Sequence, residues 1–410
     1  MEQSVKQRIA DIQRGNVPTG YRKTKCGIIP DKWSCCQSKE IFFGKSIKNN
    51  VPELPVLSVT QENGVMLRSE MDKDISYKED SVSSYKRVDI GDFVISLRSF
   101  EGGIEYSQCK GVVSPAYTIF SHSKDVDGSF YKYYFKTDFF ITKLNTAVYG
   151  IRDGKQIGFQ DFSNLFIHCP PLEEQRRIAE ILGCCDRVIA LKKKLIAEKK
   201  KQKKALMQKL LSPDSGFRLP GFSGEWKSVM LSECVTLGKV KISPADCDKS
   251  SKCIELEHIA VENGKLLGHC SPERVQSLKT VFHKNDILFG KLRPYLKKII
   301  LAPFDGICCS ECWVLKVANN INPAFLYNRL FMDDFISASC TVSGTKMPRA
   351  DWQYVKDFQL FIPEITEQQA IADILSAADK EIDLLEQELA QQEQKKKSLM
   401  QLLLTGIVRV

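Results

Sequence analysis

The stretch EEQRRIAEILGCCD at residues 173–186 returns as TEQQAIADILSAAD at residues 366–379. Residues 172–212 align with residues 365–405 without a gap, at a constant offset of 193 residues. Identical pairs begin with Glu174/Glu367 and Gln175/Gln368 and extend to Leu-Met-Gln at 206–208 and 399–401. Agreement of this length without an insertion predicts that the chain is an internal tandem repeat.

Both copies of the repeat have the pattern of a long helix. Pro171 and Pro363 stand just ahead of the copies, and neither copy contains a proline. Apolar residues recur at alternating steps of four and three, the spacing of a coiled-coil seam. The seam comprises Ile178, Leu182, Cys185, Ile189, Ile196, Leu206 and Leu210, and then Ile371, Leu375, Ala378, Ile382, Leu385, Leu389, Leu399 and Leu403. Each helix would be a rod of roughly 60 Å at about 1.5 Å per residue.

The charges predict what each helix packs against. The first window has 12 Lys/Arg against 5 Asp/Glu, a charge of +7, and the second has 4 against 8, a charge of −4. Two helices of opposite charge with matching seams favour pairing with each other. The lysine run LKKKLIAEKKKQKK at 191–204 permits nucleic-acid binding, but a solvated or partner-paired helix face explains it as well.

The segments ahead of the helices also repeat, more loosely. GDFVISLRSFEGG (91–103) corresponds to NDILFGKLRPYLKK (285–298), and GVVSPAYTIF (111–120) to GICCSECWVL (306–315). These pieces are short, rich in β-branched and aromatic residues and interrupted by Gly, Pro, Asn and Asp, which predicts strands in a mixed α/β (α+β) globule. The predicted order is a first globule at 1–170, a long helix at 171–212, a linker with a second globule at 213–362, and a long helix with a tail at 363–410.

Composition sets the outer limits. A 410-residue chain with 43% hydrophobic and 27% charged residues is typical of globular proteins with sizeable cores. Because the chain shows neither a signal-peptide pattern nor an apolar run of about 18 residues, we expect a cytoplasmic protein without a membrane association. The 15 cysteines lie in apolar contexts and predict reduced thiols rather than disulfides. A net charge of +9 permits an acidic partner such as nucleic acid.

The whole chain resembles the specificity subunit of a type I restriction–modification enzyme. The resemblance rests on the PPLEEQRRIAEIL and PEITEQQAIADIL helices, the GFRLPGFSGEW entry to the second globule, the SLRSFEGG and GVVSPAY phrases and the terminal LLLTG. It implies that each globule is a target-recognition domain for one half of a split, asymmetric sequence in double-stranded DNA. It also implies an antiparallel coiled coil that sets the gap between the half-sites and carries two methyltransferase subunits.

The resemblance further implies that chemistry lies in the partners. S-adenosylmethionine would bind the methyltransferase subunits, and ATP and magnesium would bind restriction subunits where these are present. No catalytic, cofactor or metal residues are expected in this chain.

Two basic loops in each globule suit DNA contact, since glycine lets a backbone approach closely and arginine supplies bidentate donors. They occupy matching places in the two repeats. The candidate DNA-binding residues are Ser96, Arg98, Ser99, Phe100, Arg152 and Lys155 in the first globule, and Lys291, Arg293, Tyr295, Lys346 and Arg349 in the second. The alternative for any one of them is a surface residue that only aids solubility.

Catalytic interpretations of the sequence fail. FFGKS (42–46) resembles the end of a phosphate loop, but Lys39 takes the place of the first glycine. Cys309 and Cys312 have metal-ligand spacing without a second pair, so thiols packed in a buried strand are the simpler explanation. The five histidines are scattered, and the only Pro-Pro, at 170–171, opens a helix instead of completing a methyltransferase motif. Two alternatives to a DNA-recognition subunit stay open: a self-contained DNA-modifying enzyme, and a coiled-coil scaffold whose globules bind proteins.

Overall fold

The structure is a computed structural model that describes residues 2–49, 53–60, 64–71, 82, 84–95, 103–148, 158–340 and 348–410. It forms two compact units. Unit 1 comprises Met1–Lys192 and Glu388–Val410, and unit 2 comprises Lys193–Gln387. Each unit therefore holds one strand-rich globule together with a part of both long helices, α6 (Leu172–Leu210) and α11 (Ile365–Leu404). Within the described residues, no helix is long and apolar enough to cross a membrane.

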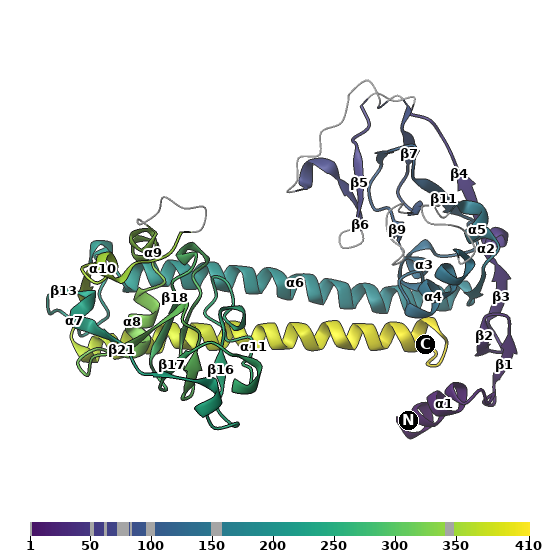
Figure 1. Ribbon diagram of the computed structural model, residues 1–410. Helices are drawn as coiled ribbons and strands as arrows, with labels where there is room; N and C mark the ends of the chain where they lie inside the picture. Colours follow the sequence, from purple (N-terminus) through teal and green to yellow (C-terminus); the bar gives the residue numbers. More distant parts are fainter. Residues whose placement is uncertain are drawn as a thin grey trace. The chain divides into compact units, whose positions relative to one another are not determined.

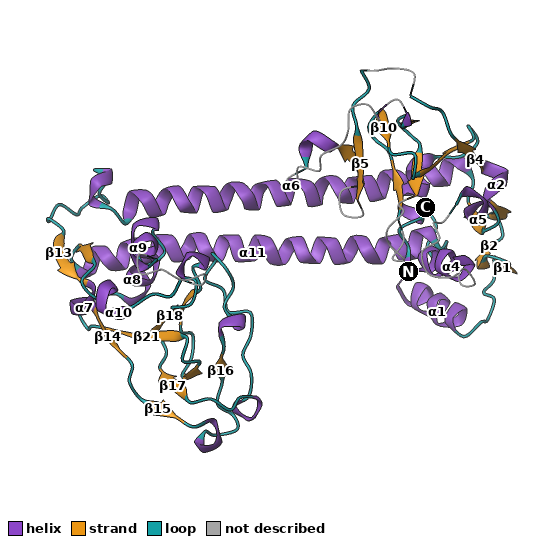
Figure 2. Cartoon of the chain, turned by 45° about the horizontal axis from the view of Figure 1, so that its top comes forward, coloured by secondary structure: helices purple, strands orange, loops and turns teal. Residues whose placement is uncertain are grey.

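In unit 1 the two helices run antiparallel and are joined by opposite charges. Lys396 of α11 lies 2.5 Å from the carboxylate of Asp186 on α6, and Lys192 of α6 lies 2.6 Å from that of Glu388. The residue number rises along α6 as it falls along α11, so the helices pair in opposite directions. Both views show them side by side (Figures 1 and 2).

Unit 2 repeats this pairing with the other ends of the helices. Lys199 lies 2.6 Å from the carboxylate of Glu381, and Lys203 lies 2.6 Å from that of Asp379. Lys200 pairs with Glu386 at 2.7 Å. Much of the lysine run is thus a partner-paired face, as the opposite helix charges predict.

The globule of unit 1 is built from short strands around a four-stranded sheet of order β4-β11-β8-β9. The pairs β10-β7, β12-β3, β5-β6 and β1-β2 complete it, all of them antiparallel. The elements are α1 (Glu2–Gln13), β1 (Tyr21–Thr24), β2 (Gly27–Pro30), β3 (Ser34–Gln37), α2 (Ser38–Ile41), β4 (Phe42–Lys45), β5 (Leu57–Thr60), β6 (Gly64–Leu67), β7 (Lys86–Val88), β8 (Phe93–Ile95), β9 (Ile104–Tyr106), β10 (Gly111–Val113), β11 (Thr118–His122), α3 (Gly128–Tyr134), α4 (Asp138–Val148), α5 (Phe159–Ser163) and β12 (Phe166–Cys169).

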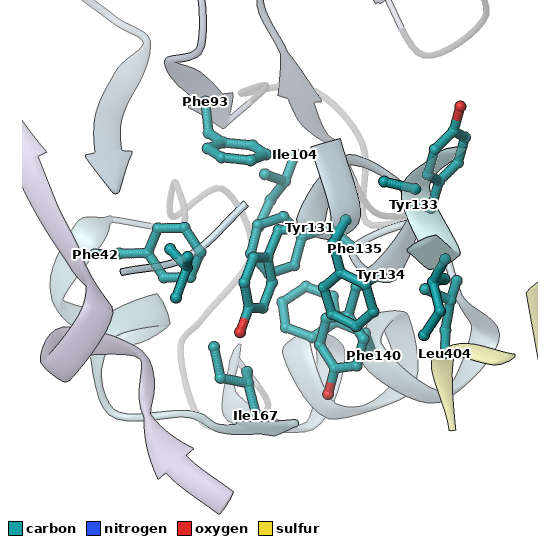
Figure 3. Packing of buried hydrophobic residues seen from close by; sticks show 14 of the residues in the cluster. Phe42, Phe93, Ile104, Tyr131, Tyr133, Tyr134, Phe135, Phe140, Ile167 and Leu404 are labelled. Atoms are coloured by element: carbon teal, nitrogen blue, oxygen red, sulfur yellow. The ribbon is translucent and has the colours of Figure 1, made fainter. Parts of the chain in front are cut away.

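The core of unit 1 is dominated by aromatic rings. Phe42 meets Phe93, Phe120 and Tyr131 edge-on, with ring centroids 5.0–5.7 Å apart. Such tilted contacts add to the burial of the rings themselves. Leu404, at the end of α11, belongs to this same buried cluster and lies in the close view of it (Figure 3). The globule core is therefore completed by the helix that follows the second globule.

Unit 2 has the same strand order in different residues. Its sheet β14-β21-β18-β19 corresponds to β4-β11-β8-β9, and a second sheet has the order β15-β17-β20-β16. The elements are β13 (Lys227–Met230), α7 (Leu231–Cys234), β14 (Val235–Leu237), β15 (Lys241–Ile242), β16 (Cys253–Ile254), β17 (Lys279–Phe282), β18 (Ile287–Gly290), β19 (Ile299–Leu301), β20 (Gly306–Cys308), β21 (Cys312–Val317), α8 (Pro323–Arg329), α9 (Asp333–Ser339), α10 (Trp352–Val355) and β22 (Gln359–Ile362). Leu210 and Leu211, from the end of α6, complete its core.

One cysteine prediction is wrong. Cys26 and Cys35 form a disulfide across the β2–β3 segment. Their spacing of nine residues gave no metal-like or oxidoreductase pattern, so only the tertiary turn at residues 26–35 brings the two sulfur atoms together. The other 13 cysteines are free.

A buried carboxylate ties the end of the chain to unit 1. Glu174 near the start of α6 accepts hydrogen bonds from Arg409 Nε and Nη2 at 2.6 and 2.7 Å and from Trp33 Nε1 at 3.0 Å. Its side chain is 6% exposed, so it depends on these donors in place of water.

We expect Arg409→Met to lower the free energy of unfolding of unit 1 by about 1.5–3 kcal/mol, the range for hydrogen bonds to a charged group. Amide hydrogen exchange of β3 would measure it. Arg176→Met is the matched control, because Arg176 is exposed and its ion pair with Glu173 should contribute less than about 0.5 kcal/mol. Equal effects of the two substitutions would contradict the role assigned to Arg409.

Candidate nucleic-acid interface

The structure describes four of the predicted DNA-binding residues: Lys291, Arg293, Tyr295 and Arg349. The others lie outside the described residues, namely Ser96, Arg98, Ser99, Phe100, Arg152, Lys155 and Lys346. The geometry of the candidate interface is therefore that of the second globule.

Two segments far apart in sequence meet there. Lys291 follows β18 directly, and its carbonyl accepts the N–H of Ala350 at 2.8 Å. The N–H of Arg293 donates to the carbonyl of Pro348 at 2.8 Å, and Leu292 pairs with Arg349 in an isolated antiparallel bridge. Pro348 and Arg349, the described end of the second basic loop, thus pair with the backbone of the first loop.

The backbone of the first loop is held in an unusual conformation. Arg293 has φ 53° and ψ 65°, and Lys297 has φ 48° and ψ 44°, both in the left-handed region. This region costs a residue with a side chain about 1–3 kcal/mol, and such strain clusters at functional sites. A short 3-10 turn, η7 (Pro294–Leu296), separates the two residues, and the ring of Tyr295 is 46% exposed. The strained turn therefore exposes Tyr295 two residues after Arg293.

The side chains of this surface differ in their partners. Arg349 Nη2 lies 2.8 Å from Glu311 Oε2. Lys297 Nζ lies 2.5 Å from Asp333 and 3.1 Å from the carbonyl of Phe331, and its hydrogen bond lowers the pKa of the Asp333 carboxyl. Among the described residues, the guanidinium of Arg293 has neither a hydrogen bond nor an ion pair, although the residue is half-buried. Arg293 is thus the arginine whose donors are available to a ligand.

Glu311 was missed in the sequence analysis. It stands in the turn before β21, and its backbone carbonyl also accepts the N–H of Lys291 at 2.9 Å. A lone acidic residue between strands carries no sequence signal, because its pairing with Arg349 arises only when β21 lies beside the 291–297 loop. Its effect is to neutralise one arginine of the candidate interface and leave Arg293 as the stronger attractor for an anion.

The segments considered for catalysis have structural roles. Phe42–Lys45 is the strand β4, and Lys45 lies 2.7 Å from Asp89 and 2.6 Å from Asp92, so its ammonium is already neutralised. Cys309 and Cys312 are buried, with their sulfur atoms 3.7 Å apart. Within the part of the chain that the structure describes, no group of three or more His, Cys, Asp or Glu side chains could hold a metal ion.

Comparison with known proteins agrees with the repeated fold. A family model described as the type I restriction modification DNA specificity domain matches twice, over residues 32–200 and 224–394. The two matches take in most of the chain and include most of both globules and of both long helices. The chain belongs to this family, with two copies of its domain.

Curated relatives are specificity subunits of type I restriction enzymes. The MjaVIII specificity subunit of Methanocaldococcus jannaschii is 28% identical over 271 residues, covering 61% of this chain and 63% of that protein. This match thus spans less than two thirds of the relative. A protein of the same organism that is named "Putative type I restriction enzyme MjaX specificity subunit" is 24% identical over 438 residues, covering 95% of this chain and 97% of that protein.

Solved structures share the fold. The type I restriction–modification S subunit from M. genitalium has a TM-score of 0.56 at 15% identity and covers 91% of this chain and 96% of its own. A chain from a study of complex assembly and conformational transition of the type I R-M system also has a TM-score of 0.56, at 14% identity, covering 93% and 99%. At these identities the likeness concerns the fold alone.

The ion pair of Arg349 with Glu311 distinguishes it from Arg293, and this difference yields a prediction. We expect Arg293→Ala to weaken recognition of one half-site by about 1–3 kcal/mol, the range for a bidentate contact to guanine. Arg349→Ala should have a smaller effect, because Glu311 already binds that guanidinium. Competition binding with duplexes altered in one half-site at a time would measure both. Equal weakening on every sequence would make Arg293 a phosphate contact, and no weakening would remove it from the interface.

Proposed function

We propose that this chain is the DNA-recognition subunit of a type I restriction–modification complex and performs no catalysis itself. Each globule would bind one half of a bipartite site, and the two half-sites would differ because the globules differ in sequence. The observation that carries the proposal is the twofold match to a DNA specificity domain. The strained basic turn around Arg293, with its unpaired guanidinium among the described residues, supports DNA as the ligand.

We infer that the paired helices set the spacer between the half-sites. An α-helix of 39 residues, such as α6, is roughly 58 Å long at 1.5 Å per residue. This length is somewhat less than two turns of B-DNA at about 34–36 Å per turn. Isolated helices bend and fray in water, whereas ion-paired antiparallel helices with a buried seam are stiffer.

The proposed partners are double-stranded DNA, two methyltransferase subunits and, where present, restriction subunits. Leu191 on α6 and Leu384 on α11 occupy equivalent places in the repeat and are 68% and 60% exposed. A large leucine exposed at the same place in each helix offers two matching apolar contacts, one for each methyltransferase subunit. S-adenosylmethionine would bind those subunits, and ATP with magnesium the restriction subunit. The proposed location is the cytoplasm.

The first prediction from this function concerns the chain alone. We expect it to bind duplex DNA with a steep dependence on salt concentration, because phosphate contacts release counterions. It should neither methylate nor cut DNA, even with S-adenosylmethionine, ATP and magnesium. Methyl transfer by a preparation shown to lack partner subunits would favour a self-contained enzyme, and failure to bind duplex DNA even at low salt would favour a protein-binding scaffold.

A second prediction tests whether the length of the paired helices sets the length of the DNA spacer. Seven residues inserted after Leu195 in α6, and seven after Leu384 in α11, keep the apolar seam on one face. The pair should lengthen by about 10 Å, equal to about three base pairs at 3.4 Å each. Mapping of methylated sites in cells should then show unchanged half-sites and a spacer wider by that amount. An active enzyme with the original spacer would show that the helices do not measure DNA.

A further inference from the structure

In the first turn of each long helix, a buried glutamine directly follows a buried glutamate. Gln175 in unit 1 and Gln368 in unit 2 are 1% and 2% exposed. They are identical positions of the internal repeat. Burying a primary amide is costly unless both its oxygen and its nitrogen are hydrogen-bonded, so the partners of each side chain must be accounted for.

In unit 1 the amide of Gln175 bridges the helix and the globule. Its Oε1 accepts the N–H of Asp127 at 2.8 Å, and its Nε2 donates to the carbonyl of Pro170 at 2.8 Å. Asp127 is the N-cap of α3, and its own carboxylate accepts the N–H groups of Ser129 and Phe130 at 2.7 and 3.3 Å. The glutamine therefore holds the first residue of a globule helix against the first turn of α6.

Unit 2 makes the same connection with different residues. Gln368 Oε1 accepts the N–H of Asn322 at 2.8 Å, and its Nε2 donates to the carbonyl of Pro363 at 2.9 Å. Asn322 is the N-cap of α8, and its Oδ1 accepts the N–H of Phe325 at 2.9 Å. We call each set of contacts a glutamine joint: Gln175 with Asp127 and Pro170, and Gln368 with Asn322 and Pro363.

In each unit, the globule helix that begins at the joint packs against the strand that follows a predicted DNA-binding loop. In unit 1 α3 packs against β9, the first strand after the loop at 96–102, and Lys136 just beyond α3 is ion-paired with Glu105 of β9. In unit 2 α8 packs against β19, the first strand after the loop at 291–298. Lys297 of that loop donates to the carbonyl of Phe331, which follows α8. In both units these contacts link the long helix, through one glutamine, to the strand that follows the loop, and in unit 2 they reach Lys297 of the loop itself.

From this geometry we propose that Gln175 and Gln368 are positioning residues that fix, relative to its long helix, the globule strand from which each recognition loop extends: β9 in unit 1 and β19 in unit 2. The inference rests on the proposed function and adds that spacer length is selected at these joints as well as by helix length. A loosened joint lets the loop tilt toward half-sites placed one base pair too near or too far. The base preference within each half-site, which depends on the loop itself, stays the same.

The test uses the complete complex with its methyltransferase subunits and duplexes that carry both mapped half-sites. The spacer is varied from two base pairs shorter to two longer, and the ratio of Kd values between off-length and native spacers is measured. Gln175→Met and Gln368→Met keep the side-chain volume and remove all four hydrogen bonds. Gln175→Glu keeps an acceptor for Asp127 N–H and serves as the milder variant if the Met variant does not fold.

We expect each Met variant to reduce discrimination against off-length spacers by about three- to tenfold, the factor for a lost hydrogen bond. Discrimination against base changes in the half-sites should not change, and Gln175→Glu should lie between wild type and Gln175→Met. The matched control is Arg176→Met, an exposed neighbour on the same helix.

A purely structural role predicts a different result: affinity falls by the same factor at every spacer length. That outcome, or variants that discriminate like wild type, would overturn the inference and leave the proposed function standing. A wild-type complex without any spacer preference would contradict both proposals, because no bipartite recognition would then exist.

Discussion

Antiparallel pairing of α6 with α11 is the constraint on which both units depend. The helix that follows each globule in sequence does not complete the core of that globule by itself. Leu404 from the end of α11 is buried in the core of unit 1, and Leu210 and Leu211 from the end of α6 are buried in the core of unit 2. Antiparallel pairing brings the end of α11 beside the start of α6 in the core of unit 1, and the start of α11 beside the end of α6 in the core of unit 2.

Opposite helix charges make this pairing specific. The carboxylates of Asp379 and Glu381 meet Lys203 and Lys199, whereas two copies of the lysine-rich α6 would place like charges together. Exposed ion pairs contribute little stability individually, so their value lies in excluding the wrong partner. Asp186 and Asp379, identical positions of the repeat, both pair with a lysine of the opposite helix, Lys396 and Lys203. The ion pairs of Asp186 and Asp379 thus recur in both units, whereas the excess of lysine on α6 distinguishes it from α11.

Periodic elements of the fold can be predicted from the sequence, whereas contacts between segments far apart in the chain cannot. Residues 172–212 and 365–405 show their helical nature in apolar spacing and flanking prolines, and the structure confirms long helices there. The identical Glu-Gln pairs at 174–175 and 367–368 were visible, but a polar pair on a helix is ordinarily exposed. Their burial depends on a globule that folds back over the first turn. The pairing of Arg349 with Glu311 and the disulfide of Cys26 with Cys35 depend likewise on contacts that local patterns do not encode.

The two halves also show which contacts a repeat must keep and which it can replace. GYR at 20–22 corresponds in sequence to GFR at 216–218, so Arg22 is the counterpart of Arg218. The buried carboxylate of unit 1 is nevertheless bound by Arg409, while Arg22 donates to the carbonyl of Trp33. In unit 2 Arg218 itself binds Glu367, at 2.9 and 2.6 Å. A buried carboxylate requires a cation, but any segment that passes nearby can supply it. The glutamine instead accepts the backbone N–H of an N-cap residue, which does not depend on the side chain there, so the same contact recurs with Asp127 in unit 1 and Asn322 in unit 2.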